Sequence, residues 1–202
     1  MASRELLGAA ARPESLTFRQ RWSHYIAVLY CLMATLIGLN LRDAALTATI
    51  SYTNSQAGIR AQYPANWLID ESGNYVFRVR DLSRPGFKTT IQVATRPVSP
   101  LTSTRNVLDA LNLSRAQTLA AYEVLSEEFY ALPDDVAATA MTYTFVDTQD
   151  NPFLQSIPVV VQGLDILTIR GGQALVITFL ADASAFDRLR PVFDQFLDNL
   201  EF

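Results

Sequence analysis

The chain has 202 residues, of which 50% are hydrophobic and 18% are charged, and its formal net charge is −4 at pH 7. From Thr47 onward it holds 11 basic and 17 acidic residues, and this net charge near −6 argues against a nucleic-acid partner, because phosphate binding requires a basic face. The one histidine, His24, and the one cysteine, Cys31, both precede Thr47. Ser-His-Asp and Cys-His catalysis, disulfides and histidine or cysteine metal ligands are therefore excluded after that point.

Residues 1–21 form a basic arm, and residues 22–41 form an apolar stretch without Asp, Glu, Lys or Arg. A helix needs about 20 mostly apolar residues to cross roughly 30 Å of hydrocarbon, so we predict a transmembrane helix over 22–41. Four arginines precede this stretch, and Arg42 follows it beside Asp43. The arginine bias predicts a single-pass protein of the cytoplasmic (inner) membrane, with its N-terminus in the cytoplasm and its C-terminal domain on the periplasmic, extracytoplasmic side.

A cleaved signal peptide is the alternative interpretation of the same stretch. Its basic region would be unusually long, and no clear small-x-small cleavage site lies between Leu41 and the charged pair Arg42-Asp43. Ala44-Ala45 and Thr47-Ala48 are weak candidate sites just beyond that pair. We therefore predict an uncleaved anchor with His24 as a polar residue at its inner edge.

Small residues recur along the predicted anchor and mark a surface for helix packing. Ala34 and Gly38 form a small-xxx-small pair, which lets a second helix approach closely. We predict a partner-binding face in the membrane made of Ala27, Cys31, Ala34 and Gly38. The alternative is an ordinary helix that faces lipid on all sides.

After a predicted linker at 42–51, the domain 52–202 begins with strand patterns. A first strand pair is expected up to Tyr63, with turn residues at Asn54-Ser55 and Gly58. Residues 75–80 and 89–95 alternate in polarity and are joined by a Pro-Gly turn, which predicts a β-hairpin. Ser103 or Thr104 should cap a short helix with Val107, Leu108 and Leu111 on its core side, and Ser114 begins a second capping-box pattern.

The second half of the domain adds strands and a final helix. Strands are expected at 122–131 and 137–147 around a turn at Pro133, at 157–170 with a kink at Gly163, and at 174–180, which is apolar on both faces and hence central. Gly171-Gly172 is a two-residue hairpin turn. A capping box at Ser184 should open the last helix, in which Pro191 predicts a kink or restart. The core-facing stripe of this helix consists of Phe186, Leu189, Phe193, Phe196 and Leu200.

Strands dominate, and hairpin turns join most neighbours, so we predict an α+β domain with an antiparallel β-sheet flanked by helices. Gly58-Ile-Arg-Ala-Gln-Tyr-Pro-Ala-Asn-Trp67 resembles the opening strand and YP-x-x-W bend of the PsbP/Mog1-like domain family. The helix after Pro100, the paired strands around Pro133, Ile157-Pro158 and the proline-bearing last helix match this family in order, so that the resemblance covers about Thr47 to Phe202.

The resemblance implies a PsbP/Mog1-like α/β/α sandwich, here preceded by one transmembrane helix. It also implies a non-catalytic accessory or assembly role on a larger complex, best known at photosystem II. Two departures from the family limit which of its properties can be expected of this chain. The photosynthetic relatives are soluble lumenal proteins without this anchor, and their proposed metal-binding histidines have no counterpart here, so a manganese or calcium role does not carry over.

The most concentrated basic group of the acidic domain lies on one predicted hairpin and consists of Arg78, Arg80, Arg84 and Lys88. We predict a docking patch for an acidic partner. The alternative is a charged, exposed edge that discourages aggregation.

Other candidate sites have simpler explanations. Asp147, Asp150 and Asn151 lack the ligand spacing of a calcium loop. Glu123, Glu127 and Glu128 offer acid/base groups, but exposed strand charges are commoner. A groove at Tyr63, Pro64 and Trp67 is less expected than a cluster that closes the core.

The expected function is therefore a non-catalytic, membrane-anchored accessory or assembly subunit of a membrane-protein complex, with a photosynthetic or respiratory electron-transfer complex as its class. The expected partners are the other subunits and the lipid bilayer, without nucleic acid, small-molecule ligand, cofactor or metal. An envelope ligand-binding or sensing module is the alternative and would require a pocket with convergent polar groups. A hydrolase that uses only carboxylates would require two of them facing each other in a cleft.

Overall fold

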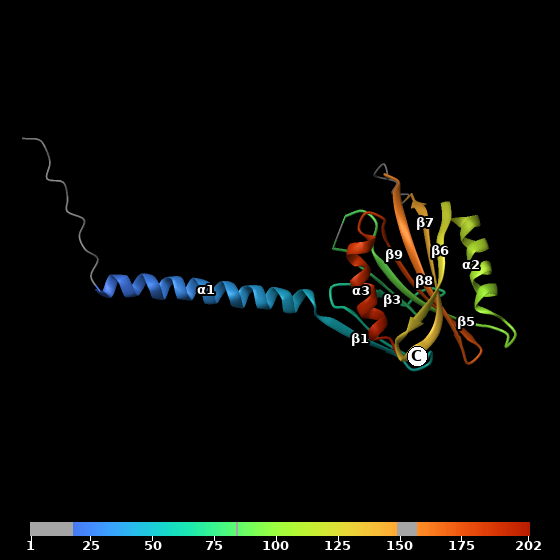
Figure 1. Ribbon diagram of the computed structural model, residues 1–202, viewed down its shortest axis with the longest axis horizontal. Coiled ribbons are helices and arrows are strands. Elements are labelled where there is room, and N and C mark those ends of the chain that lie inside the picture. Colours follow the sequence, from blue (N-terminus) through green and yellow to red (C-terminus); the bar gives the residue numbers. More distant parts are fainter. Residues whose placement is uncertain (1–17, 84, 149–156) are drawn as a thin grey trace, which may run out of the picture. The chain divides into compact units, whose positions relative to one another are not determined.

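The structure of the chain is a computed structural model, which describes residues 18–83, 85–148 and 157–202 (Figure 1). The chain divides into two compact units, one that ends at Thr47 and one that begins at Ala48. Most of the predicted cytoplasmic arm lies outside the described residues, and its last four residues belong to the first helix.

The first unit contains helix α1 (Phe18–Leu46). Its segment Trp22–Ala45 has a mean hydropathy of 1.7, and none of it is buried. By length and composition this helix is able to cross a membrane, and a signal sequence has the same properties. The helix continues past Leu41 because Ala44 and Ala45 are strong helix formers, and β1 begins at Thr49. Of the predicted linker at 42–51, residues 42–46 belong to α1 and residues 49–51 to β1.

The second unit opens with a two-stranded antiparallel sheet of β1 (Thr49–Asn54) and β2 (Ile59–Pro64). In the turn, the Asn54 side-chain oxygen accepts hydrogen bonds from the backbone amides of Gln56 and Ala57. Gly58 has a φ of 68°, a conformation that glycine adopts at little cost. The expected turn chemistry at Asn54 and Gly58 is thus confirmed.

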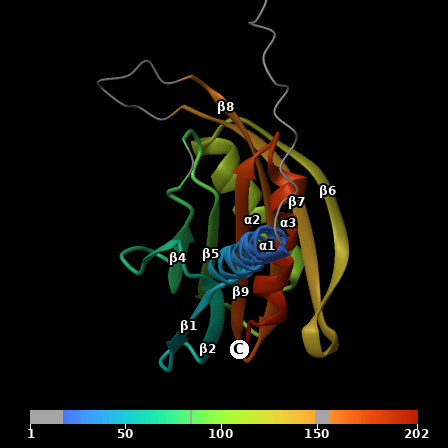
Figure 2. The same ribbon diagram turned by 90° about the vertical axis from the view of Figure 1, so that its left-hand side faces the viewer.

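The main sheet has seven strands in the order β3-β4-β5-β9-β8-β7-β6, and all its pairs are antiparallel (Figure 2). Gly171 and Gly172, both with positive φ, make the turn between β8 and β9. Strand β9 lies in the middle of the sheet, as its apolar sequence predicted. The strands are β3 (Leu68–Asp70), β4 (Phe77–Arg80), β5 (Thr90–Pro97), β6 (Ala120–Leu132), β7 (Val136–Asp147), β8 (Val159–Arg170) and β9 (Gln173–Asp182).

Helices α2 (Thr104–Thr118) and α3 (Phe186–Asp198) lie on opposite faces of this sheet (Figure 1). One apolar core forms with α3, where Phe193 stacks on Phe179 with ring centroids 5.0 Å apart. A second core forms with α2, where Leu108 packs with Met141 and Tyr143. The domain is therefore the predicted α+β fold, an antiparallel sheet flanked by helices.

Three predictions about helix boundaries are wrong. Ser114 lies inside a continuous α2, because the helix face that carries Leu111 and Arg115 stays packed on the sheet. The hydroxyl of Ser184 donates to Asp182 and caps no helix. Helix α3 does not restart at Pro191 but runs through it. Pro191 and Asp187, whose carbonyl lacks an amide donor, are both exposed, while the apolar stripe remains packed. The Ser103 cap is confirmed, since its hydroxyl accepts a hydrogen bond from the Asn106 amide at 3.3 Å.

Candidate functional site

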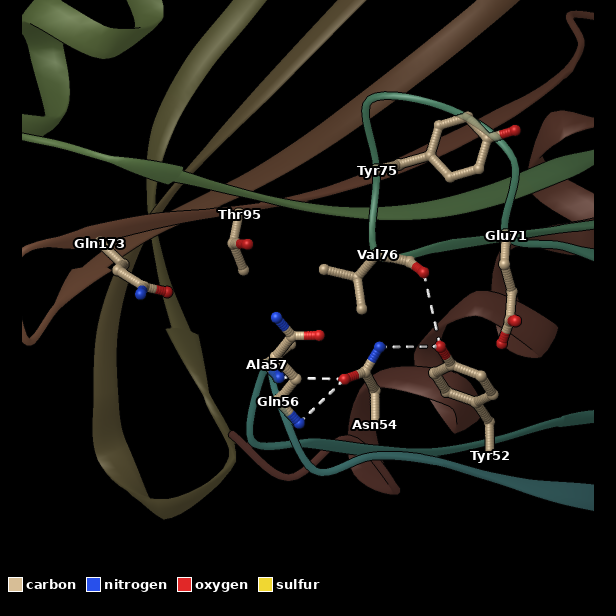
Figure 3. Close-up of a pocket in the computed structure, with 9 residues that line it drawn as sticks. All are labelled: Tyr52, Asn54, Gln56, Ala57, Glu71, Tyr75, Val76, Thr95 and Gln173. Carbon is tan, nitrogen blue, oxygen red and sulfur yellow. Dashed lines mark hydrogen bonds between the residues drawn. The ribbon is translucent and has the colours of Figure 1, made fainter.

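A polar pocket of about 470 Å³ lies between the two sheets of the second unit (Figure 3). The end of β1 and the following turn contribute Tyr52, Asn54, Gln56 and Ala57, the β3–β4 loop contributes Glu71, Tyr75 and Val76, and β5 and β9 contribute Thr95 and Gln173. A second pocket of about 510 Å³ adjoins it and shares Tyr75, Val76 and Thr95. Four chain segments thus converge on one polar hollow.

Tyr52 is held in place at the wall of this pocket. Its hydroxyl donates to the Val76 carbonyl at 3.4 Å and accepts from the Asn54 amide at 3.3 Å, and its ring packs on Phe77 with centroids 4.4 Å apart (Figure 3). Burial, together with the hydrogen bond and negative charge of Glu71, raises the pKa of Tyr52, although the hydrogen bond from Asn54 opposes the shift. The phenol therefore stays neutral at physiological pH.

The pocket can bind polar groups, but its lining does not provide a pair of acid/base groups. Gln56, Thr95 and Gln173 are drawn around one side of it in Figure 3, and their side chains make no hydrogen bond to any residue that the structure describes. Glu71 is the one carboxylate among the lining residues. The side-chain amides of Gln56 and Gln173 and the hydroxyl of Thr95 suit a small polar ligand. Sequence reasoning missed this pocket because its residues come from four separate segments.

Two members of the predicted basic docking group are paired inside the domain. Arg78 donates to Asp70 with a nitrogen–oxygen distance of 2.6 Å, and Arg80 approaches the same carboxylate oxygen at 3.8 Å. The guanidinium of Arg78 also lies 4.8 Å from the ring centroid of Tyr75, whose hydroxyl donates to Asp70 at 2.8 Å. Hydrogen bonds from Ser72, followed by those from Arg78 and Tyr75, hold the pKa of Asp70 well below its ordinary value.

This pairing reduces the positive charge available to a partner. Lys88 is half-buried and makes an interaction of its own, and Arg84 lies outside the described residues. Docking by Arg78, Arg80, Arg84 and Lys88 remains a prediction. Asp70 escaped the sequence analysis because its three-residue strand was not foreseen, although strand pairing places it directly opposite Arg78.

The predicted membrane face of the anchor also remains a prediction. Ala27, Cys31, Ala34 and Gly38 follow one another at four- and three-residue steps within α1, so they share one side of the helix. A Cβ atom added to Gly38 would meet nothing within 4 Å, so this position is open to a neighbour. The Thr35 hydroxyl is satisfied locally by the Cys31 carbonyl at 2.8 Å.

A buried ion pair that sequence reasoning missed joins α2 to the sheet. Arg115 of α2 donates to Asp165 of β8, whose side chain is fully buried and also accepts from the Thr178 hydroxyl at 2.7 Å. The guanidinium lies 4.3 Å from the ring centroid of Tyr143, and a Cβ atom at Gly163 would overlap that ring.

The charges of this cluster are fixed by their surroundings. Burial lowers the pKa of Arg115, but the attraction of Asp165 outweighs it and the pKa is raised. Burial, followed by the charge of Asp165, raises the pKa of Tyr143. The guanidinium is thus charged and the phenol neutral at physiological pH. Because Asp165 is inaccessible, the pair can position α2 but cannot act on a substrate.

The remaining sequence candidates are dispersed. Glu123, Glu127 and Glu128 are exposed along β6, and no group of three His, Cys, Asp or Glu side chains within the described ranges is arranged to hold a metal ion. Tyr63 and Trp67 are buried in the core that contacts α3, in agreement with the core interpretation. Asp147 ends β7, whereas Asp150 and Asn151 lie outside the described residues, so their calcium hypothesis has no structural test.

The sequence matches no protein-family model and no curated protein. Among solved structures, the domain is similar to cyanobacterial PsbP (CyanoP) from Synechocystis sp. PCC 6803, with a TM-score of 0.57, 15% identity and coverage of 76% of this chain and 92% of that chain. It is also similar to LpqN, involved in cell envelope biogenesis of Mycobacterium tuberculosis, with a TM-score of 0.50, 12% identity and coverage of 76% and 89%. At these identities the likeness shows the fold alone. The domain that follows the apolar helix α1 therefore has a PsbP-like fold.

Proposed function

We propose that this chain is a non-catalytic, membrane-anchored accessory or assembly subunit of a larger membrane-protein complex. The observation that carries the proposal is an apolar helix joined to a PsbP-like domain by only two residues, Thr47 and Ala48. Two residues span at most about 7 Å, so a membrane-embedded α1 would hold the domain close to the bilayer. Such tethering raises the local concentration of the domain around its membrane neighbours.

The chemistry of the described residues supports an accessory role better than an enzymatic one. The polar pocket offers one carboxylate, Glu71, and the carboxylate of the Arg115–Asp165 pair is fully buried. No histidine or cysteine follows Thr47 in the sequence. General acid/base and nucleophilic catalysis both require groups of matched reactivity within reach of a substrate.

The class of complex is proposed by analogy with the family resemblance. A cyanobacterial PsbP among the solved neighbours supports it, whereas LpqN is involved in cell envelope biogenesis. We take a photosynthetic or respiratory electron-transfer complex as the partner class. This step is an analogy, because one fold hosts many functions.

The proposal is tested by the location and the genetic effect of the chain in its own cells. A C-terminally tagged chain should resist alkaline extraction from membranes, and protease added to the periplasmic side should digest the domain. Deleting the chain should lower the abundance of one membrane complex, and a copy with Glu71→Ala should restore it. Digestion only from the cytoplasmic side, or restoration by a copy without residues 1–45, would contradict the proposal.

A second function, an envelope ligand-binding or sensing module, is favoured by the polar pocket. The unused side-chain groups of Gln56, Thr95 and Gln173 converge on a volume large enough for a small polar molecule. Mass spectrometry of denatured, purified full chain is the discriminating measurement. A small molecule released from the natural protein, and absent from a variant with Gln56→Ala and Gln173→Ala, would favour this second function over the first.

A further inference from the structure

Strand β6 forms one edge of the seven-stranded sheet (Figure 2). Its inner side pairs with β7, and none of the strands within the described ranges pairs with its outer side. An edge strand presents unpaired backbone N–H and C=O groups along that side, which are a template for another strand. The opposite edge of the sheet is β3, which has only three residues. β6, with 13 residues, is therefore the longer of the two open edges.

Large apolar side chains are exposed on this edge. The exposed fractions are 76% for Phe129, 53% for Leu125 and 40% for Val124. The pairing register places Phe129 opposite Thr139 of β7, which in turn lies opposite Leu167 of β8. Leu167 belongs to the core on the α2 side and is fully buried. Phe129 thus lies on the α2 side of the sheet at its outer edge, separated from Leu167 by Thr139, and nothing described in the structure covers it.

Acidic side chains flank these apolar residues. Glu123, Glu127 and Glu128 are all exposed on β6, and no basic residue lies on the strand. Because Glu127 and Glu128 are adjacent, they point to opposite faces of the sheet, so both faces of the edge are negative next to Phe129. A strand added here would meet a carboxylate on each face.

Irregular pairing limits the part of β6 that can accept another strand. The register with β7 shifts between Ala120 and Glu123 and again between Val124 and Ser126. From Ser126 to Leu132 the pairing is regular. Bulges and charges are common protections against aggregation at sheet edges, but they do not account for an exposed Phe129 within the regular segment.

The charge pattern decides between two occupants of the edge. If a second copy of β6 paired here in antiparallel register, Glu127 and Glu128 of the two copies would lie close together, and like charges in opposite positions destabilise strand pairs. A segment with lysine or arginine at those positions would instead form favourable cross-strand pairs. The occupant is therefore a different protein with a basic segment.

We propose that residues 126–132 of β6 bind an extended segment of a partner protein as an additional strand. Basic side chains of that segment pair with Glu127 and Glu128, and an apolar side chain packs beside Phe129. Main-chain hydrogen bonds supply affinity in this type of recognition, and the flanking side chains supply specificity. The inference rests on the proposed function in one respect, namely that the chain has a protein partner. It adds the surface that this partner contacts.

The test uses the full chain in the membranes of its own cells, with p-benzoylphenylalanine replacing Phe129 for photocrosslinking. A matched control carries the same analogue in place of Leu113, which is 64% exposed on α2. The charge variant combines Glu127→Lys with Glu128→Lys. Its control makes the same change in net charge at two other exposed positions, through Asp109→Lys and Asp187→Lys.

We expect a crosslink from position 129 to a lysine- or arginine-containing segment of one partner, and none to that segment from position 113. The crosslink should fall at least tenfold in the charge variant and stay unchanged in its control. A synthetic peptide of the crosslinked segment should bind the purified full chain in detergent micelles and slow amide hydrogen exchange in residues 126–132. Unchanged thermal unfolding of the charge variant would exclude misfolding as the cause.

Several results would overturn the inference. They are the absence of a crosslink from position 129, a crosslink only to a second copy of the chain, a yield insensitive to Glu127→Lys and Glu128→Lys, or peptide protection of strands other than β6. A charge variant that keeps its place in a stable complex would overturn this inference and leave the proposed function intact. A wild-type chain that is extracted as a monomer would overturn both.

Discussion

Replacing Arg115 with methionine should destabilise the domain strongly, because it leaves a buried carboxylate without its cation. The Asp165 side chain is 0% exposed and that of Arg115 is 17% exposed, so water cannot take the place of the lost partner. After Arg115→Met, Asp165 keeps the hydrogen bond from the Thr178 hydroxyl, which does not supply the lost positive charge. The substitution also removes the contact between the guanidinium and the ring of Tyr143.

Breaking a buried ion pair by removing one partner costs about 3–5 kcal/mol. For a domain of this size, each kcal/mol lowers the melting temperature by about 2–4 °C, which gives a decrease of about 6–20 °C. Adding Asp165→Asn to Arg115→Met should recover part of this loss, because no unpaired buried charge then remains. Exposed Arg105, on the same helix, provides the control, and Arg105→Met should change stability by no more than about 0.5 kcal/mol.

Thermal unfolding of the three full-length variants and of the wild type, followed by near-ultraviolet circular dichroism in one detergent, measures these differences. A loss below about 1 kcal/mol in Arg115→Met would refute the reasoning, since it would mean that the pair contributes no more than a surface contact. A double variant less stable than Arg115→Met alone would also refute it.

Three further perturbations follow from the structure. Gly163→Ala should cost about 1–3 kcal/mol through overlap with the Tyr143 ring, and an unchanged melting temperature would contradict this. Asp70→Asn should lower stability at neutral pH. The pKa of Asp70 is lower in the folded state than its ordinary value of 3.8, so the ionised carboxylate stabilises the fold above pH 3.8. This stabilisation is lost as the pH falls from 3.8 through the folded-state pKa. The free energies of unfolding of wild type and variant, measured with denaturant, should therefore converge in acid. Gly38→Leu should reduce co-purification of partner subunits without affecting membrane insertion, whereas Ile37→Leu should leave both unchanged.

Much of the fold was predictable because its signals are local. Alternation placed Met141, Tyr143 and Phe145 on one buried face, and the spacing of Phe186, Leu189 and Phe193 identified the core side of α3. These periodicities depend only on neighbouring residues. The errors at Ser114 and Pro191 arose where tertiary packing of α2 and α3 outweighed a local helix-stop signal.

The features that sequence reasoning missed depend on residues distant in the chain. Arg115 and Asp165 are 50 positions apart, and a single aspartate in an apolar strand does not reveal which helix will supply its partner. The basic residues Arg78 and Arg80 were identified, but their pairing with Asp70 follows from strand register. The polar pocket has the same origin, because its walls exist only after two sheets pack together.

The central claim, a membrane-held subunit that keeps its helix, is tested most directly by native mass spectrometry of the gently extracted assembly. We expect a complex with a fixed number of copies of the chain, and a chain ejected from it should have close to the full mass of 22.4 kDa. A free monomer, or a complex whose copy of the chain lacks the mass of residues 1–45, would contradict the claim.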